Sequence, residues 1–266
     1  MRREKSNYII QSVSHALDVL EQFSNDADEL GVTELSKRLK LHKNNVFRLL
    51  ATLESRGYIE QNRATENYRL GIHCLQLGQS YVQHMGILRQ AGPIMQELSR
   101  QARETAYVAF LRRGGAVPVQ VVEPDRAVRI VLRLGDVLPL HCTAAGKAFL
   151  AFETEDDLRA LLPDPLPKHT ERTPVDRQVL QQQLKSITSS GYAVDMGEHV
   201  EDVRAVAVPI RDNTRTVVSV LAMAGPGYRF TAERIEKELG PLTLKGGREL
   251  SARLGFDVAP AREAQA

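Results

Sequence analysis

The chain has 266 residues, of which 42% are hydrophobic and 26% charged, with a formal net charge of +2. This length predicts two domains, and the composition is that of a globular protein rather than of a disordered or fibrous one. The sequence holds neither an apolar run of roughly eighteen residues nor a signal core, so we expect a cytoplasmic protein without a membrane partner, in which Cys74 and Cys142 are reduced thiols.

The first predicted elements are two short helices. Residues from about Ser12 to Phe23 form the first, and Ser12 is available as its cap. Its apolar positions recur at helical spacing: Val13, Ala16, Leu17, Leu20 and Phe23. Thr33 can cap the second helix, whose Leu35 and Leu39 are expected to face inward.

A third helix is predicted within residues 41–58, with one apolar and one polar side. Its apolar stripe consists of Val46, Leu49, Leu50 and Leu53. Its other side carries Asn44 and Arg48, flanked by Asn45, Phe47 and Thr52. In a major groove, Asn pairs with adenine, Arg pairs with guanine and apolar groups touch thymine methyls. A helix, a tight connection and a second helix form a helix-turn-helix, in which the second helix reads bases.

A wing is predicted next, because two short strands, 58–61 and 67–70, follow the glycine that ends the third helix. Arg63 at the hairpin tip and Lys43 at the start of the third helix are the expected phosphate contacts. The surrounding basic residues are Lys37, Arg38, Lys40, Arg48 and Arg56. A solvated surface is the ordinary alternative for such a cluster, but here the cluster coincides with the predicted reading surface.

Helical periodicity resumes at residue 72. A break is predicted at Gly92-Pro93, because proline lacks an amide hydrogen and restricts the residue before it. We therefore expect a DNA-binding domain in residues 1–71, a linker helix in 72–91, a second domain in 92–258 and a disordered tail in 259–266.

The second domain alternates groups of strands with helices. Strands are predicted at 107–112, 117–123, 128–134, 192–196, 204–211 and 216–224. Helices are predicted at 143–152, 153–162, 176–190 and 231–254. This order predicts an α+β fold in which helices pack on a mostly antiparallel sheet.

Taken in order, these motifs resemble the IclR (isocitrate lyase regulator) family of bacterial transcription factors from Ser12 to about Gly255. The matching residues are Val32-Thr33-Glu34-Leu35-Ser36, Val46-Phe47-Arg48-Leu49-Leu50, Gly57-Tyr58, Tyr68-Arg69-Leu70-Gly71, Leu138-Pro139-Leu140-His141-Cys142-Thr143-Ala144-Ala145-Gly146-Lys147-Ala148, Gly191-Tyr192, Asp195, Glu198, Val208-Pro209-Ile210 and Ala224-Gly225-Pro226. The resemblance implies a winged helix-turn-helix joined by a linker helix to a GAF-like domain that binds a small organic acid effector. It also implies a homodimer or dimer of dimers on double-stranded, pseudo-palindromic operator DNA.

The resemblance further implies which residues bind the effector. They are Leu132, His141, Thr143, Ala144, Ala145, Gly146, Asp195, Ala205, Ala222 and Ala224. Several relatives have Cys or Ser where this chain has Ala205, Ala222 and Ala224, and the loss of those polar groups leaves a more apolar and roomier pocket. We therefore expect an aromatic or partly apolar acid rather than glyoxylate.

Catalytic and metal chemistry find less support in the sequence. It has neither a Gly-x-Ser-x-Gly motif nor a dinucleotide fingerprint, so we expect no enzyme and no cofactor. His141, Cys142, Asp195, Glu198 and His199 include every common zinc ligand type. Their spacing is not that of a structural zinc site, and His199 is expected to face solvent, so no metal is expected.

Two questions stay open from the sequence. The segment from Thr143 to Lys147 is either an anion cradle or a capped helix that packs closely. For the whole chain we expect a transcriptional regulator, a repressor, gated by its effector. The alternative is a metabolite-binding module or small-molecule enzyme with a vestigial DNA-binding domain.

Overall fold

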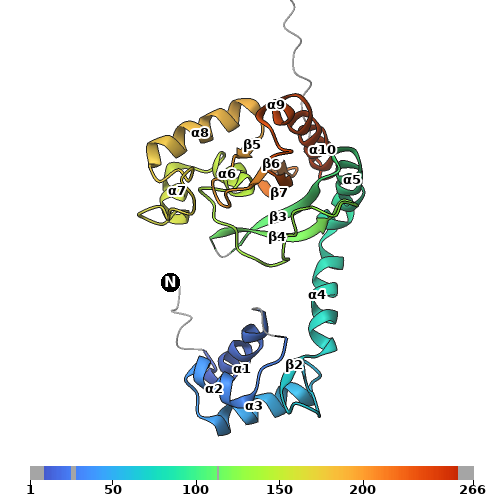
Figure 1. Ribbon diagram of the computed structural model, residues 1–266, viewed down its shortest axis with the longest axis vertical. Helices are drawn as coiled ribbons and strands as arrows, with labels where there is room; N and C mark the ends of the chain where they lie inside the picture. The colour runs from blue at the N-terminus through green and yellow to red at the C-terminus, as the bar shows by residue number, and fades with distance from the viewer. Residues whose placement is uncertain (1–8, 25–27, 113, 257–266) are drawn as a thin grey trace, which may run out of the picture. The chain divides into compact units, whose positions relative to one another are not determined.

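The computed structural model describes residues 9–24, 28–112 and 114–256 of the chain. They form two compact units, which divide between His84 and Met85 (Figure 1). Among these residues, no helix combines the length and the apolar character that crossing a bilayer requires. The tail predicted for 259–266 lies outside the described residues.

Three helices and a hairpin make up the N-terminal unit. The elements are α1 (Gln11–Glu21) with a 3-10 turn (Gln22–Ser24), α2 (Val32–Leu39), α3 (Lys43–Ser55), β1 (Ile59–Gln61) and β2 (Tyr68–Leu70). The helices enclose a core in which Val19, Leu35, Val46 and Leu50 are fully buried. The two strands pair antiparallel, as the predicted wing requires.

The helix starts in this unit differ from the predictions. Ser12 and Thr33 lie inside their helices, which begin after Ile10 and Gly31 without a side-chain cap. Burial of Val19 and Leu35, rather than a cap, therefore fixes these helices. Of the apolar residues that recur at helical spacing in α1, Val13 and Leu17 are exposed. Gly57 ends α3 as predicted, with a φ of +70° that favours glycine.

The helices that follow the wing are α4 (Ile72–His84) and α5 (Gly86–Ala102). They are separated at Met85, so the break predicted at Gly92-Pro93 was wrong. Pro93 lies inside α5, where it removes one helical hydrogen bond. The helix buries Leu88, Ala91 and Met95 on one face, on both sides of the proline, and this burial outweighs the lost bond.

The C-terminal unit is built on a five-stranded sheet in the order β4-β3-β7-β6-β5, antiparallel throughout. Its strands are β3 (Thr105–Arg112), β4 (Gly115–Val122), β5 (Ala193–Asp195), β6 (Val203–Arg211) and β7 (Val217–Pro226). The predicted α+β class is confirmed. The strand predicted at 128–134 was wrong, because this segment follows an irregular course and makes no ladder. The Thr105 hydroxyl donates to the carbonyl of Ile130 and holds the segment near β3.

Helices cover both faces of the sheet (Figure 1). Besides α5, the helices of this unit are α6 (Ala144–Leu150), α7 (Glu155–Leu161), α8 (Arg177–Ser190), α9 (Ala232–Arg234), a π-helical stretch (Ile235–Leu239) and α10 (Gly240–Arg253). Toward α5 and α10 the strands present large side chains: Val206, Val208, Ile210, Leu221 and Met223. Toward α6 and α8 they present Ala109, Ala205, Ala207, Ala222 and Ala224. We call this second surface the alanine face; its small side chains leave room beside the sheet.

Candidate DNA interface and ligand cavity

The N-terminal unit displays a helix with a buried back and a polar front. The Nδ1 atom of His42 accepts the N–H of Asn44 at 3.4 Å and caps α3. Val46 and Leu50 turn inward. The residues predicted to face DNA on this helix are all exposed: Lys43, Asn44, Asn45, Phe47, Arg48 and Thr52. Phe47 is 56% exposed, which places an aromatic ring among amides and a guanidinium, where it can contact bases.

The tip of the wing is fixed by one carboxylate. Glu29 accepts hydrogen bonds from Asn62 Nδ2 at 2.7 Å and from the Thr65 hydroxyl at 2.8 Å. These bonds lower the pKa of Glu29. Arg63 lies exposed at the tip between them. Arg69 pairs with a glutamate across the hairpin instead, so Arg63 is the better placed of the two arginines for a phosphate.

A cavity of about 340 Å³ opens on the alanine face in the C-terminal unit. Its lining comes from the sheet, the start of α6, segment 130–138 and the loop after β5. The lining residues are Tyr107, Ile130, Val131, Leu132, Arg133, Asp136, Leu138, Thr143, Ala144, Asp195, His199, Val200, Val203, Ala205 and Ala224. Ala205 and Ala224 are direct partners across β6 and β7. The cavity is mostly apolar with a few polar groups, which is typical of a small-molecule site.

The structure brings part of the predicted effector set to this cavity. Leu132, Thr143, Ala144, Asp195, Ala205 and Ala224 line it. His141, Ala145, Gly146 and Ala222 lie outside its lining. The His141 ring turns to the carbonyl of Pro167, at 2.8 Å from Nε2. Gly146 packs on Leu140, whose backbone oxygen would lie 2.4 Å from an added Cβ, and both Ala145 and Ala222 are buried in the core.

Several lining residues were not predicted. Tyr107 pairs with Ala222 in the sheet. The sequence alone does not predict this pairing, because it depends on the order of the strands. Ile130 and Arg133 belong to the segment wrongly predicted to be a strand. His199, expected in solvent, is partly buried and lines the cavity.

Asp195 is the buried carboxylate of the cavity, with 4% of the residue exposed. Its Oδ1 accepts the backbone N–H groups of Gly197 at 2.9 Å and Glu198 at 2.7 Å. Burial raises the pKa of Asp195 to about 7, and the charge of Glu198 adds to the rise. Near neutral pH this carboxyl can therefore either donate or accept a hydrogen bond toward a ligand.

A buried ion pair holds the cavity wall in place. Lys147 on α6 lies 2.6 and 2.7 Å from the two carboxylate oxygens of Glu198, and Gln183 accepts a further bond at 3.1 Å. Both ionic side chains are less than one-tenth exposed. The pair fixes the loop that carries His199 and Val200 into the lining.

Three potential metal ligands meet beside the cavity. One ligand atom from each of His141, Cys142 and His169 lies within 4.8 Å of the others. The ring centroid of His199 is 5.1 Å from that of His169. Burial lowers the pKa of His141 and of His199, and raises the pKa of Cys142 to about 12. Asp195 and Glu198, weighed as ligands from the sequence, bind other partners instead.

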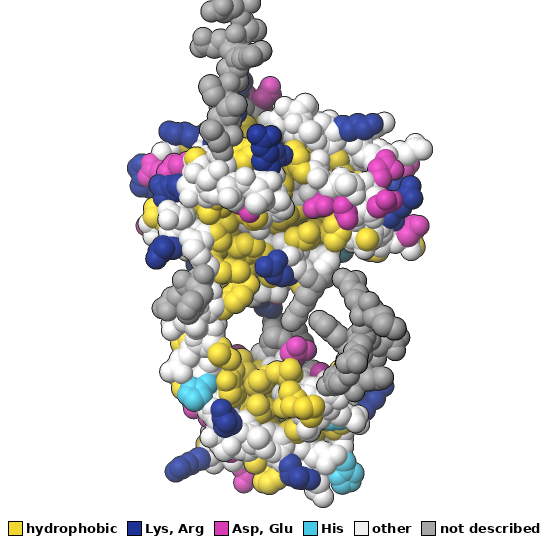
Figure 2. Space-filling view, turned by 180° about the vertical axis from the view of Figure 1, so that it is seen from behind, with side chains coloured by type: hydrophobic (Ala, Val, Ile, Leu, Met, Phe, Trp, Pro, Cys, Tyr) yellow, Lys and Arg dark blue, Asp and Glu magenta, His cyan; other side chains and the backbone are white. Residues whose placement is uncertain are grey.

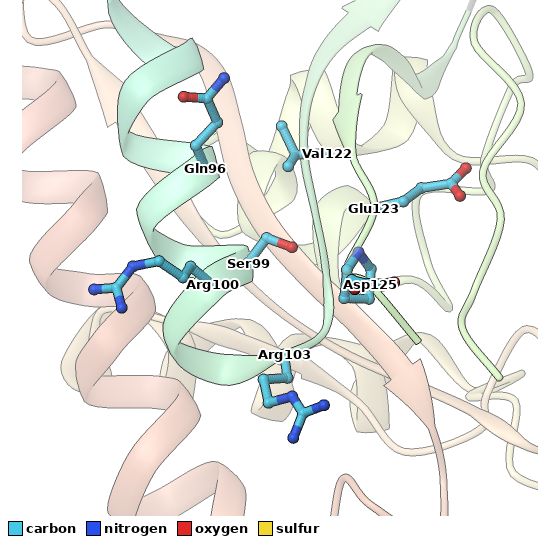
Figure 3. A pocket seen from close by; sticks show the side chains of 8 residues that line it. Gln96, Ser99, Arg100, Arg103, Val122, Glu123 and Asp125 are labelled. Atoms are coloured by element: carbon cyan, nitrogen blue, oxygen red, sulfur yellow. The ribbon is translucent and has the colours of Figure 1, made fainter. Parts of the chain in front are cut away.

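A more open groove lies between α5 and the end of β4 (Figure 3). Its volume is about 420 Å³. In Figure 3, Gln96, Ser99 and Arg100 lie along the helix, and Glu123 lies across from them. Glu123 forms an ion pair with Arg129. The groove contains none of the predicted effector residues and is walled by charged side chains, so the cavity on the alanine face is the candidate ligand site.

A winged helix-turn-helix with a polar reading face, followed by an α+β unit with a partly open cavity, defines a DNA-binding protein with a separate second domain. Comparison with known families agrees. Residues 12–63 match the IclR helix-turn-helix domain, and residues 79–252 match the bacterial transcriptional regulator IclR C-terminal domain. The chain belongs to the IclR family of transcriptional regulators.

Individual relatives support this assignment. The chain is 35% identical to the HTH-type transcriptional regulator XynR of Escherichia coli (strain K12), over 93% of this chain and 98% of XynR. It is 30% identical to the HTH-type transcriptional repressor AllR of the same strain, over 94% of this chain and 92% of AllR. The crystal structure of an IclR family regulator from Brucella abortus matches with a TM-score of 0.75 and 28% identity, covering 95% of each chain.

Proposed function

We propose that this regulator represses transcription by binding operator DNA through α3 and the wing, and that an aromatic or partly apolar organic acid in the cavity controls that binding. The observation that carries the proposal is the cavity on the alanine face. The name of AllR, a repressor, supports the direction of control. For an effector to act, its affinity must differ between the DNA-binding and the non-binding states.

The lining of the cavity supports this class of ligand. Tyr107, Leu132 and Leu138 offer apolar surface for a ring, and Arg133 supplies the guanidinium that suits a carboxylate. The volume of about 340 Å³ lies within the range of small-molecule sites. An IclR homolog from Microbacterium hydrocarbonoxydans, which has the same fold at 21% identity and a TM-score of 0.80, has been crystallised with 4-hydroxybenzoate.

Benzoate-like acids are expected to raise the melting temperature of the full chain, whereas glyoxylate is not. A ligand at a hundred times its dissociation constant adds about 2.7 kcal/mol of stability, which a thermal-shift assay detects. Ala224→Val should weaken the response, because the larger side chain fills part of the cavity floor. Ser99→Ala, in the open groove, should leave the response unchanged. A shift by glyoxylate and by none of the aromatic acids would contradict the proposed ligand class.

Arg48→Ala is expected to cost about 1–3 kcal/mol of operator affinity and to relax specificity at one base pair. Lys43→Ala should instead weaken binding to all sequences alike and reduce its salt dependence. Fluorescence anisotropy with operator and random duplexes measures both effects. Arg159, exposed on α7, supplies the control substitution. Unchanged affinity in Arg48→Ala would reject the assigned reading face. A preference for the operator below roughly 10³ would favour the metabolite-binding alternative.

We also propose that the protein acts as a homodimer. Ile10, just before α1, forms an exposed apolar stripe with Val13 and Leu17 of that helix, and Leu75 and Tyr81 are exposed on α4. Hydrophobic side chains gather on this unit in the view of Figure 2. Exposed apolar patches of this kind mark interaction surfaces, and two identical units match two operator half-sites. Sedimentation equilibrium should give at least twice the chain mass of 29.6 kDa. A monomer at micromolar concentration would reject the proposal.

A further inference from the structure

The cluster of His141, Cys142 and His169 has no part in the function proposed above. It unites two imidazoles and a thiol from segments far apart in the chain, with one ligand atom of each within 4.8 Å of the others. His141 and Cys142 are buried, whereas His169 is exposed. The cluster is therefore closed on its inner side and can be reached from solvent at His169.

The backbone on both sides of the cluster is anchored. His141 and Cys142 directly precede Thr143, whose hydroxyl caps α6 by accepting the N–H of Gly146 at 3.0 Å. The N–H of His169 donates to the hydroxyl of Thr173 at 3.0 Å. That hydroxyl in turn donates to the carbonyl of Glu198 at 2.6 Å. These bonds fix where both segments lie, so the approach of the three side chains is a property of the fold.

A hydrogen bond of His141 also fixes the protonation of its ring. Its Nε2 lies 2.8 Å from the carbonyl oxygen of Pro167 and donates its hydrogen to it, because a carbonyl can only accept. The ring then keeps an unprotonated Nδ1, the nitrogen that can bind a metal. Metal-binding histidines in proteins commonly donate their second ring N–H to a backbone carbonyl in this way. This bond leaves Nδ1 as the ring nitrogen of His141 with a lone pair for a metal.

We propose that His141, Cys142 and His169 form a binding site for a divalent transition metal of the zinc class. Two imidazoles and a thiolate suit Zn²⁺, whereas Mg²⁺ and Ca²⁺ prefer oxygen ligands. Bond lengths of about 2.0–2.3 Å place neighbouring donors of a tetrahedral site roughly 3.3–3.8 Å apart. The ligand atoms now lie within 4.8 Å of one another, and a small rotation of the exposed His169 side chain can bring its ring nitrogen to the shorter distance. On binding, the thiol of Cys142 releases its proton to solvent and the thiolate joins the metal.

The site would share a wall with the ligand cavity. Three protein ligands leave a fourth tetrahedral position, which water or His199 can fill. His199 packs against His169 with ring centroids 5.1 Å apart, and it also lines the cavity, as does Thr143. A bound metal would therefore tie the loop after β5 to the start of α6 next to the effector. The proposal does not depend on which acid that effector is.

Titration of the full-length apoprotein with Co²⁺ tests the site directly. We expect one Co²⁺ per chain, with the visible d–d bands of a tetrahedral ion and a thiolate-to-cobalt charge-transfer band in the near ultraviolet. Zn²⁺ should displace it. His169→Ala should weaken binding by more than about tenfold, the lower end of what loss of an outer-shell partner already costs. Since His169 is exposed, this variant should fold normally.

Matched variants decide whether the named residues hold the metal. Lys168→Ala, on the same loop, should leave Co²⁺ binding unchanged. Cys142→Ser should abolish the charge-transfer band, whereas Cys74→Ser should preserve it. Unchanged affinity in His169→Ala, or a charge-transfer band that depends on Cys74, would overturn the proposal. Absence of any stoichiometric Co²⁺ or Zn²⁺ binding by the folded chain would overturn it as well.

Discussion

Lys147→Met is expected to lower the free energy of unfolding of the C-terminal unit by about 3–5 kcal/mol. The substitution removes the cation 2.6 Å from Glu198 and leaves that carboxylate buried with nothing to neutralise it. Methionine fills a similar volume, so packing changes little and the effect reports the unpaired charge. Few single substitutions cost this much.

Urea unfolding followed by circular dichroism measures the effect. The double variant Lys147→Met/Glu198→Leu should lose less stability than Lys147→Met alone, because both charges leave the interior together. Lys168→Met is the control, since Lys168 and Glu171 form an exposed pair of the kind that contributes about 0–1 kcal/mol. A loss below about 1 kcal/mol in Lys147→Met would mean that water reaches the pair. The variant should also respond less to ligand, because Glu198 holds the loop that carries His199.

Asp195→Asn is expected to stabilise the protein by up to about 4 kcal/mol above pH 7. Burial raises the pKa of Asp195 from 3.8 to about 7, so the folded chain disfavours the charged form. Each tenfold change in proton affinity corresponds to about 1.4 kcal/mol, so the rise in pKa from 3.8 to about 7 corresponds to about 4 kcal/mol. Asparagine is neutral at every pH, and its oxygen can still accept the backbone N–H groups of Gly197 and Glu198.

The pH dependence of this effect has a definite sign. Between pH 4 and 7 the folded state binds a proton that the unfolded state lacks, so the contribution of Asp195 to stability grows as the pH falls through this window. Above pH 7 the carboxylate is charged in both states and its full cost remains. Urea unfolding at pH 5 and pH 8 should show a gain for Asp195→Asn that is large at pH 8 and smaller at pH 5. Asp156→Asn, exposed on α7, serves as control, and an equal gain at both pH values would reject the explanation.

The elements that were predictable share a strong periodic pattern. Helix α3 has apolar residues at helical spacing and a glycine at its end, and β6 and β7 are long apolar strands between turn residues. The failures have local causes. Pro93 predicts a helix break because proline lacks an amide hydrogen, but the apolar face of α5 continues on both sides of it. Segment 128–134 alternates apolar residues as a strand does, yet those side chains serve the cavity rather than a ladder.

From spacing alone, the candidate sites were predictable only where residues lie close in sequence, whereas Leu132, Asp195, Ala205 and Ala224 were predicted through the family resemblance. The residues predicted to face DNA share α3 except for Arg63 on the wing, and Thr143 and Ala144 follow one another into the cavity. His169 is different, since its place beside Cys142 depends on a proline-rich loop that returns to His141. The local sequence pattern does not predict that this loop places His169 next to His141. Tyr107 likewise became a lining residue only through the strand order, which brings β3 beside β7.

The alanine face also bears on how regulators of this kind diversify. Ala205 on β6 and Ala224 on β7 are neighbours on two paired strands, and each contributes a single methyl group to the cavity lining. One nucleotide change converts an alanine codon to valine, serine or threonine. Each such step alters the depth or the polarity of the cavity while the strands keep their register. Under the proposed function, one mutation at either position would change which effector fits and leave promoter recognition intact, which makes these two positions targets for building biosensors from this chain.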